Sequence, residues 1–295
     1  VTHAETDRVL VEKQRCVGVE YRKDGRTHVA RVESEVILSA GVIGSPRILM
    51  LSGIGPEDVL QGAGIVPRHA LSGVGRNLQD HPLLGGLVYE CKGELPPLRN
   101  NGAESTLWWK SNPALTGPDI QPVFLEFPLA TPELAGQLPG PNCYTISPSV
   151  VRPASRGSVT LSSSDPTASP VIDVNFLECD ADVRAMLAAV ELCREIGNSD
   201  AFSAFRKREV MPGPLAGNEM IRFVRNAVST YFHPTSTCAM GPGKECVVDH
   251  TLRVHGIESL RIADASIMPN VTSGNTNAPS VMIGEKLVEL VRSGT

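Results

Sequence analysis

The sequence lacks several features that mark particular classes of protein. Its seven cysteines form no CxxC pair and are odd in number, which supports neither a metal site nor a disulfide framework. Lysine and arginine are scattered along a chain of net charge −5, which argues against nucleic acid as the main partner. No apolar run approaches the ~20 residues of a membrane helix. We therefore expect no metal and no membrane span, and a reducing compartment such as the cytoplasm.

The beginning of the chain is also unusual. Val1 stands where a methionine would start translation, and the residues after it alternate in polarity as a strand does. The first 16 residues are charged throughout and contain no apolar signal core. This start predicts a fragment or a processed product of a longer chain.

The first part of the chain is typical of an α/β protein. Residues 16–21 and 35–40 predict strands, and the apolar triplet Val36, Ile37 and Leu38 suits a strand covered on both faces. After a turn of small residues, residues 46–53 predict a helix that carries Pro46 in its first turn. We expect a strand-turn-helix unit here.

The middle and the end of the chain differ from each other in composition and in predicted secondary structure. From about residue 83, proline and glycine clusters separate short strands such as 157–166, and residues 180–196 predict a helix with one apolar stripe. The end returns to a strand at 259–266, a loop, and a helix from residue 280, which Asn277 could cap. We predict three segments: 1–82, 83–227 and 228–295.

A stretch of small residues follows the second predicted strand. Ser39, Ala40, Gly41 and Gly44 lead from this strand into the helix. Isolated glycine motifs have a plain explanation in tight packing between a strand and a helix. They also suit a cofactor that lies across the carboxyl end of the strand.

Two histidines stand in polar segments that could form a site. His81 follows Asp80 in the segment GVGRNLQDHP, where the pair either acts in catalysis or organises an interdomain loop. His233 stands among hydroxyl and aromatic residues in STYFHPTSTCAMG. A lone histidine is more often structural than catalytic, so a catalytic role for His233 needs support from other segments of the sequence.

One such segment ends the chain. Asp264 and Ala265 close a predicted strand, and Asn275 and Thr276 stand just before the last predicted helix. The start of a helix presents free N–H groups and a partial positive charge, so it stabilises an anion such as a reduced flavin.

Four long segments follow one another along the chain: EVILSAGVIGSPRILMLSGIGP, then GVGRNLQDHP, then HPTSTCAMG with VVDHTLRVHGIESLRIADASIMP, and finally NTNAPSVMIGEK. Together they resemble the signature segments of the glucose-methanol-choline (GMC) oxidoreductases, including choline dehydrogenase-like and alcohol oxidase-like members. The resemblance covers essentially the whole chain. Several long motifs in the correct order are far more specific than any single motif.

The resemblance implies a fold and a cofactor. The fold would be α/β (α+β), with part of an FAD-binding Rossmann-like domain in residues 1–82 and 228–295 and an antiparallel-sheet substrate domain in residues 83–227. The cofactor would be FAD and the substrate a small-molecule alcohol. The residues that it places near FAD are Thr6, Ser39, Ala40, Gly41, Asp264, Ala265, Asn275 and Thr276.

The resemblance also implies a mechanism. His233 would remove the hydroxyl proton of the alcohol, and Asn275, which stands where other members have histidine or asparagine, would hydrogen-bond the same oxygen. Hydride would pass from the carbinol carbon to flavin N5. Asn275 is compatible with choline-type, aliphatic and aromatic alcohols, so it does not select one.

Two departures from the family pattern stand out. Ser236 occupies a position where many members have glycine. The sequence also contains no GxGxxG unit, although that unit holds the FAD pyrophosphate in the family. We therefore expect the chain to bind FAD poorly by itself and to need an N-terminal half from a longer chain or a partner.

Other interpretations remain open at this stage. On the same scaffold, a hydroxynitrile lyase would use His233 for acid-base chemistry with a structural flavin, and a non-catalytic fragment would need no flavin. A hydrolase is disfavoured because the sequence has no GxSxG elbow. In the middle segment, Trp108, Trp109, Phe124 and Phe127 could line an apolar pocket or belong to the core.

Overall fold

The chain folds into two compact units. The structure is a computed structural model that describes residues 1–98 and 100–294. Unit 1 contains Val1–Gln79, Arg156–Asn175 and Pro234–Thr295, and unit 2 contains Asp80–Ser155 and Phe176–His233. The units differ from the predicted segments in one respect. Residues 156–175, which belong to the predicted middle segment 83–227, lie in unit 1.

The described part of unit 1 contains an antiparallel three-stranded sheet, two parallel strand pairs and one antiparallel strand pair. The three-stranded sheet is β1 (Glu5–Glu12), β2 (Arg15–Lys23) and β3 (Arg26–Arg31). One parallel pair is β4 (Val36–Leu38) with β16 (Leu260–Ile262). The others are β5 (Ile54–Gly55) with β6 (His69–Ala70), and β12 (Ser158–Thr160) with β13 (Val171–Asp173). Its helices are α1 (Gly41–Leu51), α2 (Glu57–Gly62), the 3-10 turn η3 (Ala265–Ile267) and α5 (Asn277–Arg292).

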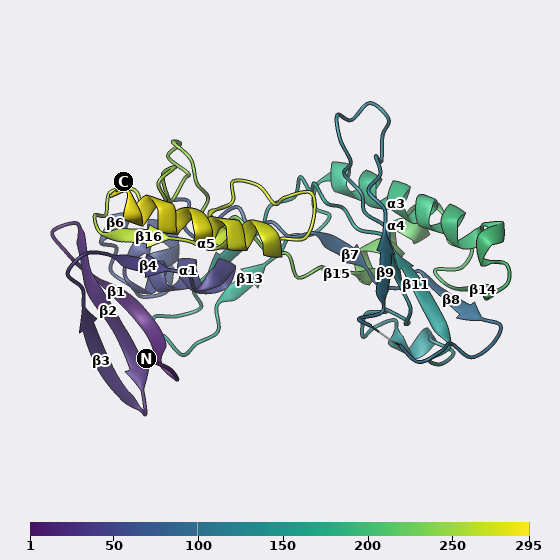
Figure 1. Cartoon of the computed structure of the whole chain (residues 1–295), viewed down its shortest axis with the longest axis horizontal. Helices are drawn as coiled ribbons and strands as arrows, with labels where there is room; N and C mark the ends of the chain where they lie inside the picture. The colour runs from purple at the N-terminus through teal and green to yellow at the C-terminus, as the bar shows by residue number, and fades with distance from the viewer. Residues whose placement is uncertain (99, 295) are drawn as a thin grey trace. The chain divides into compact units, whose positions relative to one another are not determined.

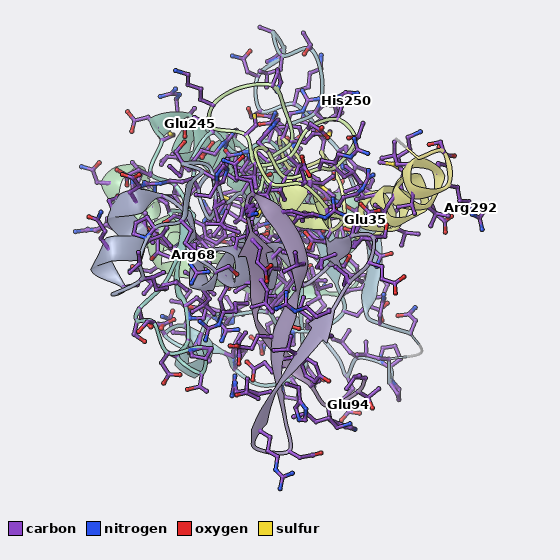
Figure 2. The ribbon with its side chains drawn as sticks, turned by 90° about the vertical axis from the view of Figure 1, so that its left-hand side faces the viewer. Glu35, Arg68, Glu94, Glu245, His250 and Arg292 are labelled. Carbon is purple, nitrogen blue, oxygen red and sulfur yellow. The ribbon has the colours of Figure 1, made fainter. Side chains whose placement is uncertain are left out.

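The parallel pair of β4 and β16 joins residues that are far apart in the sequence. Val36 and Leu38 are buried in the core of unit 1, but Ile37 is 40% exposed. The prediction that this strand is covered on both faces is therefore wrong for the described structure, because the strand alternates between one covered and one open face. Glu35, labelled in Figure 2, lies just before β4 and accepts a hydrogen bond from Arg261 Nε at 2.7 Å.

Helix α1 begins earlier than its sequence predicts. It starts at Gly41, so Pro46 lies inside the helix and not in its first turn. A proline at this position cannot donate to the carbonyl four residues earlier. The Val42 carbonyl instead accepts a hydrogen bond from Thr237 Oγ1 at 2.6 Å. A side chain from a distant segment thus satisfies the group that the proline leaves without its usual donor.

The last predicted helix is present, with a different start. Helix α5 begins at Asn277, so Asn277 is its first residue and Thr276 precedes it as the capping residue, without a side-chain capping bond. Ile283 packs into the core of unit 1. Figure 1 shows α5 in yellow along unit 1, and Figure 2 shows Arg292 of its last turn at the periphery.

Unit 2 is built around a five-stranded antiparallel sheet. Its strands, in spatial order, are β14 (Arg206–Met211), β8 (Val88–Cys91), β11 (Cys143–Ser147), β10 (Val123–Leu125) and β9 (Ala103–Thr106). A separate antiparallel pair joins β7 (Pro82–Leu84) to β15 (Val228–Thr230). The helices are α3 (Asp180–Asn198) and α4 (Gly217–Ala227), with the 3-10 turns η1 (Ala135–Gln137) and η2 (Asp200–Phe202).

Helix α3 confirms the predicted helix over residues 180–196. Val183, Met186, Val190 and Cys193 of its apolar stripe are buried in unit 2, and Leu187 is partly buried beside them. Figure 1 shows α3 and α4 together beside the sheet. An amphipathic helix of this kind derives most of its stability from burying that stripe. By contrast, the strand predicted over residues 157–166 is reduced to the three residues of β12.

Candidate active site

The strand pair of β7 and β15 brings together two segments that are about 150 residues apart. Thr230 pairs with Pro82 in this antiparallel pair, so the start of β7 lies beside the end of β15. His81 directly precedes β7, and Tyr231 directly follows β15. The Tyr231 N–H donates to the His81 carbonyl at 3.0 Å and extends the pairing by one step.

The Asp80 carboxylate fixes this junction from within. Its Oδ1 accepts the backbone N–H groups of His81 at 2.7 Å and of His233 at 2.9 Å, and its Oδ2 accepts the hydroxyl of Thr230. Thr230 Oγ1 in turn accepts the Phe232 N–H at 2.8 Å, where Phe232 has a left-handed φ of 60°. Asp80 therefore holds the backbone of both histidines at once.

The two imidazoles meet directly. His81 Nδ1 lies 3.0 Å from His233 Nδ1, and the rings are nearly perpendicular, with centroids 5.1 Å apart and planes at 82°. The Tyr231 ring packs against His233 with centroids 4.5 Å apart. His81 is completely buried and His233 is 7% exposed. The orientation of His233 is thus fixed by its backbone, by a ring-to-ring hydrogen bond and by an aromatic neighbour.

Burial sets the electrostatics of this cluster. It lowers the pKa of His233 below its usual value, because a charged imidazolium would lose hydration. Burial likewise raises the pKa of Asp80, an effect that its hydrogen bonds from Thr230 and from the two backbone N–H groups oppose. It also raises the pKa of the Tyr231 hydroxyl. Burial thus favours the neutral imidazole of His233, the form that can accept a proton.

In unit 1, the carboxyl ends of β4 and β16 bring a second group of predicted residues together. Asp264 Oδ2 accepts the Gly41 N–H at 2.9 Å and the Ser45 hydroxyl at 2.6 Å, and its Oδ1 accepts the Ser266 N–H at 2.8 Å. Ser39 Oγ donates to the Ala263 carbonyl at 3.0 Å. Both Asp264 oxygens are engaged within the fold, so this side chain holds the start of α1 against η3.

The backbone in front of this group is open. Gly41 has a φ of 78°, and a β-carbon added there would meet no atom within 4 Å. Ser39 and Ala40 are exposed. This combination of a left-handed glycine and open space is what the close approach of a ligand to the backbone requires. Thr6 lies on β1, which packs beside α1.

The remaining predicted residues lie near the start of α5. Asn275 is exposed and Thr276 is buried, and the Thr276 carbonyl accepts the Ser280 hydroxyl at 2.7 Å. Ala265 belongs to η3, which contacts α5, and its carbonyl accepts the Ser236 N–H at 3.2 Å. Ser236 has a φ of 78°, which explains physically why glycine suits its position.

The predicted catalytic pair is divided between the units. His233 is the last residue of unit 2, whereas Asn275 belongs to unit 1, so their convergence stays a prediction. In the sequence, Asp80 and His81 are candidates without a link to His233, and no pattern indicates Thr230. No signal in the sequence could have found these contacts, because they depend on strand pairing across about 150 residues.

The aromatic residues of the middle segment have different environments. Trp108 and Trp109 are 42% and 54% exposed. Phe124 packs against Tyr144 with ring centroids 5.6 Å apart, and both line a cavity of about 490 Å³ within unit 2. Phe127 packs over Gly102. Of the four, Phe124 therefore fits the pocket interpretation best.

Among residues 1–98 and 100–294, no three or more His, Cys, Asp or Glu side chains come together as a metal site would require. Within the same residues, every helix is too short or too polar to cross a membrane.

Two family models match the chain. The N-terminal model of the GMC oxidoreductases matches residues 1–83, and the C-terminal model matches residues 153–284. The chain belongs to the GMC oxidoreductase family. The predicted family is confirmed. The signature segments of this GMC chain contain the two contacting histidines, His81 and His233, and also Asp264 with its partner Gly41.

Curated relatives of the GMC chain include an alcohol dehydrogenase and a choline dehydrogenase. It is 36% identical over 321 residues to the alcohol dehydrogenase [acceptor] of Pseudomonas putida, covering 99% of this chain and 57% of the relative. It is 38% identical over 315 residues to the mitochondrial choline dehydrogenase of Mus musculus, covering 97% and 52%. The chain thus spans about half the length of these relatives.

Solved structures confirm the mixed α/β fold. Pyridoxine 4-oxidase from Mesorbium loti matches with a TM-score of 0.91 at 32% identity, covering 97% of this chain and 56% of that one. Formate oxidase from Aspergillus oryzae RIB40 matches with a TM-score of 0.86 at 27% identity, covering 99% of this chain and 60% of that one. Its structure was solved to examine the modification of its FAD. The family and these structures support FAD as the cofactor. The prediction that an N-terminal unit is missing is not confirmed, because the N-terminal family model matches residues 1–83.

Proposed function

We propose that this GMC chain forms the catalytic part of an FAD-dependent oxidoreductase that acts on the CH–OH group of an alcohol, with His233 as the base. The observation that carries the proposal is the state of His233. His233 is buried and oriented by three neighbours, and its lowered pKa favours the neutral form. A base in this state can accept a proton without first losing one.

The roles of the chain's own residues follow from this state. His233 Nδ1 lies 3.0 Å from His81 Nδ1, and we assign the removal of the hydroxyl proton to the other ring nitrogen of His233, Nε2. The Asn275 carboxamide donates a hydrogen bond to the same oxygen and does not titrate. This role requires Asn275 of unit 1 and His233 of unit 2 to meet at the substrate, and that meeting is part of the proposal.

The residues at the ends of β4 and β16 fit one part of an FAD molecule. The open backbone at Ser39, Ala40 and Gly41 allows close approach, and the start of α5 offers N–H groups and a positive dipole beside Asn275 and Thr276. FAD supplies the hydride acceptor when it is bound. Asp264 contributes by holding the start of α1 in place.

The fit covers only part of the cofactor. The sequence has no GxGxxG unit to hold the pyrophosphate. We therefore propose that the isolated chain binds FAD poorly and that full binding needs an N-terminal half, supplied by a longer chain or by a partner.

The experiment uses the FAD-loaded protein, prepared with its N-terminal half where the isolated chain stays colourless. Anaerobic mixing with alcohols is followed through the visible absorbance of the flavin. We expect an alcohol to bleach the flavin. His233→Asn is expected to slow bleaching by about 10²–10⁴-fold, the usual contribution of a positioned base, and to keep the oxidised spectrum.

The same experiment separates the other functions. A hydroxynitrile lyase leaves the flavin oxidised while it cleaves a cyanohydrin. A non-catalytic fragment takes up no flavin even with an N-terminal half present. Unchanged bleaching by His233→Asn contradicts the assignment of the base, and His28→Asn, which alters an exposed histidine of β3, is the matched control.

A further inference from the structure

The contact between His81 and His233 joins the same atom of both rings. The two Nδ1 atoms are 3.0 Å apart, within the range of an N–H···N hydrogen bond. A neutral imidazole carries one proton, on either Nδ1 or Nε2. One Nδ1 of the pair must therefore carry the proton and the other must accept it.

The direction of this hydrogen bond decides which nitrogen of His233 can act. If His81 donates, His233 carries its proton on Nε2, and that atom cannot remove another proton. If His233 donates through Nδ1–H, its Nε2 keeps a lone pair. The partner of one ring nitrogen commonly fixes the state of the other in this way.

We propose that His81 is a positioning residue for His233: its Nδ1 accepts the Nδ1–H of His233 and thereby holds the base in the tautomer whose Nε2 carries the lone pair. This inference rests on the proposed function for its consequence in catalysis. The tautomer itself is a property of the folded chain and can be measured without a substrate.

The surroundings of the pair support this role. His81 is completely buried, so the surrounding protein holds its ring in place with Nδ1 facing His233 Nδ1 at 3.0 Å. Asp80 Oδ1 holds the backbone N–H of both histidines, which keeps the two rings in register. Tyr231, which is also titratable, packs its ring against His233 and lies edge-on to His81.

The same hydrogen bond also supports the step that follows proton removal. When Nε2 of His233 takes the substrate proton, the ring becomes an imidazolium with protons on both nitrogens. Its Nδ1–H then donates as a charged group to His81 Nδ1, and charged hydrogen bonds are roughly twice as strong as neutral ones. No proton or electron beyond those of the substrate is needed.

The direct test is nuclear magnetic resonance of the chain with nitrogen-15 in its seven histidines. Long-range proton-nitrogen spectra distinguish a protonated from an unprotonated ring nitrogen, and single replacements assign the signals. We expect His233 to show a protonated Nδ1 and an unprotonated Nε2 near neutral pH. A protonated Nε2 on neutral His233 overturns the proposal, whether or not the enzyme is active.

Two variants of His81 extend the test. His81→Leu removes the acceptor, and His81→Asn keeps an oxygen near the Nδ1 position. We expect His81→Leu to give mixed tautomers of His233 and His81→Asn to restore the Nδ1–H form. Because His81 is buried, both are compared by thermal unfolding, with His28→Asn as the control. If His81→Leu is unfolded, the wild-type spectrum and His81→Asn still decide the question.

Kinetics of the FAD-loaded protein separate positioning from simple stability. We expect His81→Leu to lower kcat by about 10–100-fold, a usual loss when the partner that orients a functional histidine is removed, with KM little changed and partial recovery in His81→Asn. Equal kcat in all three proteins contradicts the role of His81. If His233→Asn also keeps full activity, the proposed function itself fails, and the two failures are thus distinguishable.

Discussion

Removing the Asp80 carboxylate should destabilise unit 2 more than any ordinary surface change. Asp80→Ala leaves the buried backbone N–H groups of His81 and His233 without their acceptor and also frees the Thr230 hydroxyl. Each buried polar group left without a partner costs about 1–3 kcal/mol.

The net magnitude is smaller than the sum of these losses. Burial raises the pKa of Asp80, so part of the gain from its hydrogen bonds is already offset by the cost of burying its charge. We expect Asp80→Ala to lower the free energy of unfolding by about 2–4 kcal/mol. Asp80→Asn keeps an oxygen for both N–H groups and should lie within about 1 kcal/mol of the wild type.

Urea unfolding measures this difference. Both tryptophans of the chain, Trp108 and Trp109, lie in unit 2, so their fluorescence reports the unit that contains Asp80. A loss of this size moves the midpoint by about 1 M when the slope is near ~3 kcal/mol/M. Asp200→Ala, an exposed position in the same unit, is the matched control. If Asp80→Ala has the same midpoint as Asp200→Ala, the anchoring role of the carboxylate is refuted.

Four further outcomes are expected. Ser236→Gly should leave thermal stability equal or slightly higher, whereas Ser236→Val should lower it by more than ~1 kcal/mol, since a branched residue strains at a φ of 78°. Met186→Ala in the core of unit 2 should cost about 2–5 kcal/mol in urea unfolding. The rate of flavin reduction should fall on acidification with a midpoint below pH ~6.5, because burial lowers the pKa of His233. Acid should also lower the free energy of unfolding, because His233 binds a proton at higher pH in the unfolded state than in the folded state. Thiol reagents should modify Cys179 and Cys246 before the buried cysteines, as counted by the absorbance released in the native state.

The local patterns of the sequence predicted much of the secondary structure. The apolar spacing of residues 180–196 corresponds to α3, and residues 16–21 lie within β2. The errors concern boundaries that distant residues set. Helix α1 extends in front of Pro46 because Thr237 satisfies the carbonyl of Val42, and periodicity contains no record of such a contact.

In the candidate site, too, the sequence indicated individual residues but not the contacts between distant ones. The motif around His233 made this residue a candidate, and only the family resemblance implied the role of a base, which stays a prediction. The sequence did not predict that His81 would meet His233 through Nδ1, or that Asp80 would hold both backbones. These contacts exist because β7 pairs with β15 in one particular register.

The sequence by itself determined the family, the cofactor class and the helix and strand types with strong local periodicity, since these depend on the identity and spacing of neighbouring residues. Only the tertiary structure decided which polar groups satisfy one another. It paired the imidazole of His81 with that of His233 and aimed the Asp264 carboxylate at the start of α1. The physical reason is that a hydrogen bond depends on atoms a few ångströms apart in space, and the spacing of residues along the chain does not encode that distance.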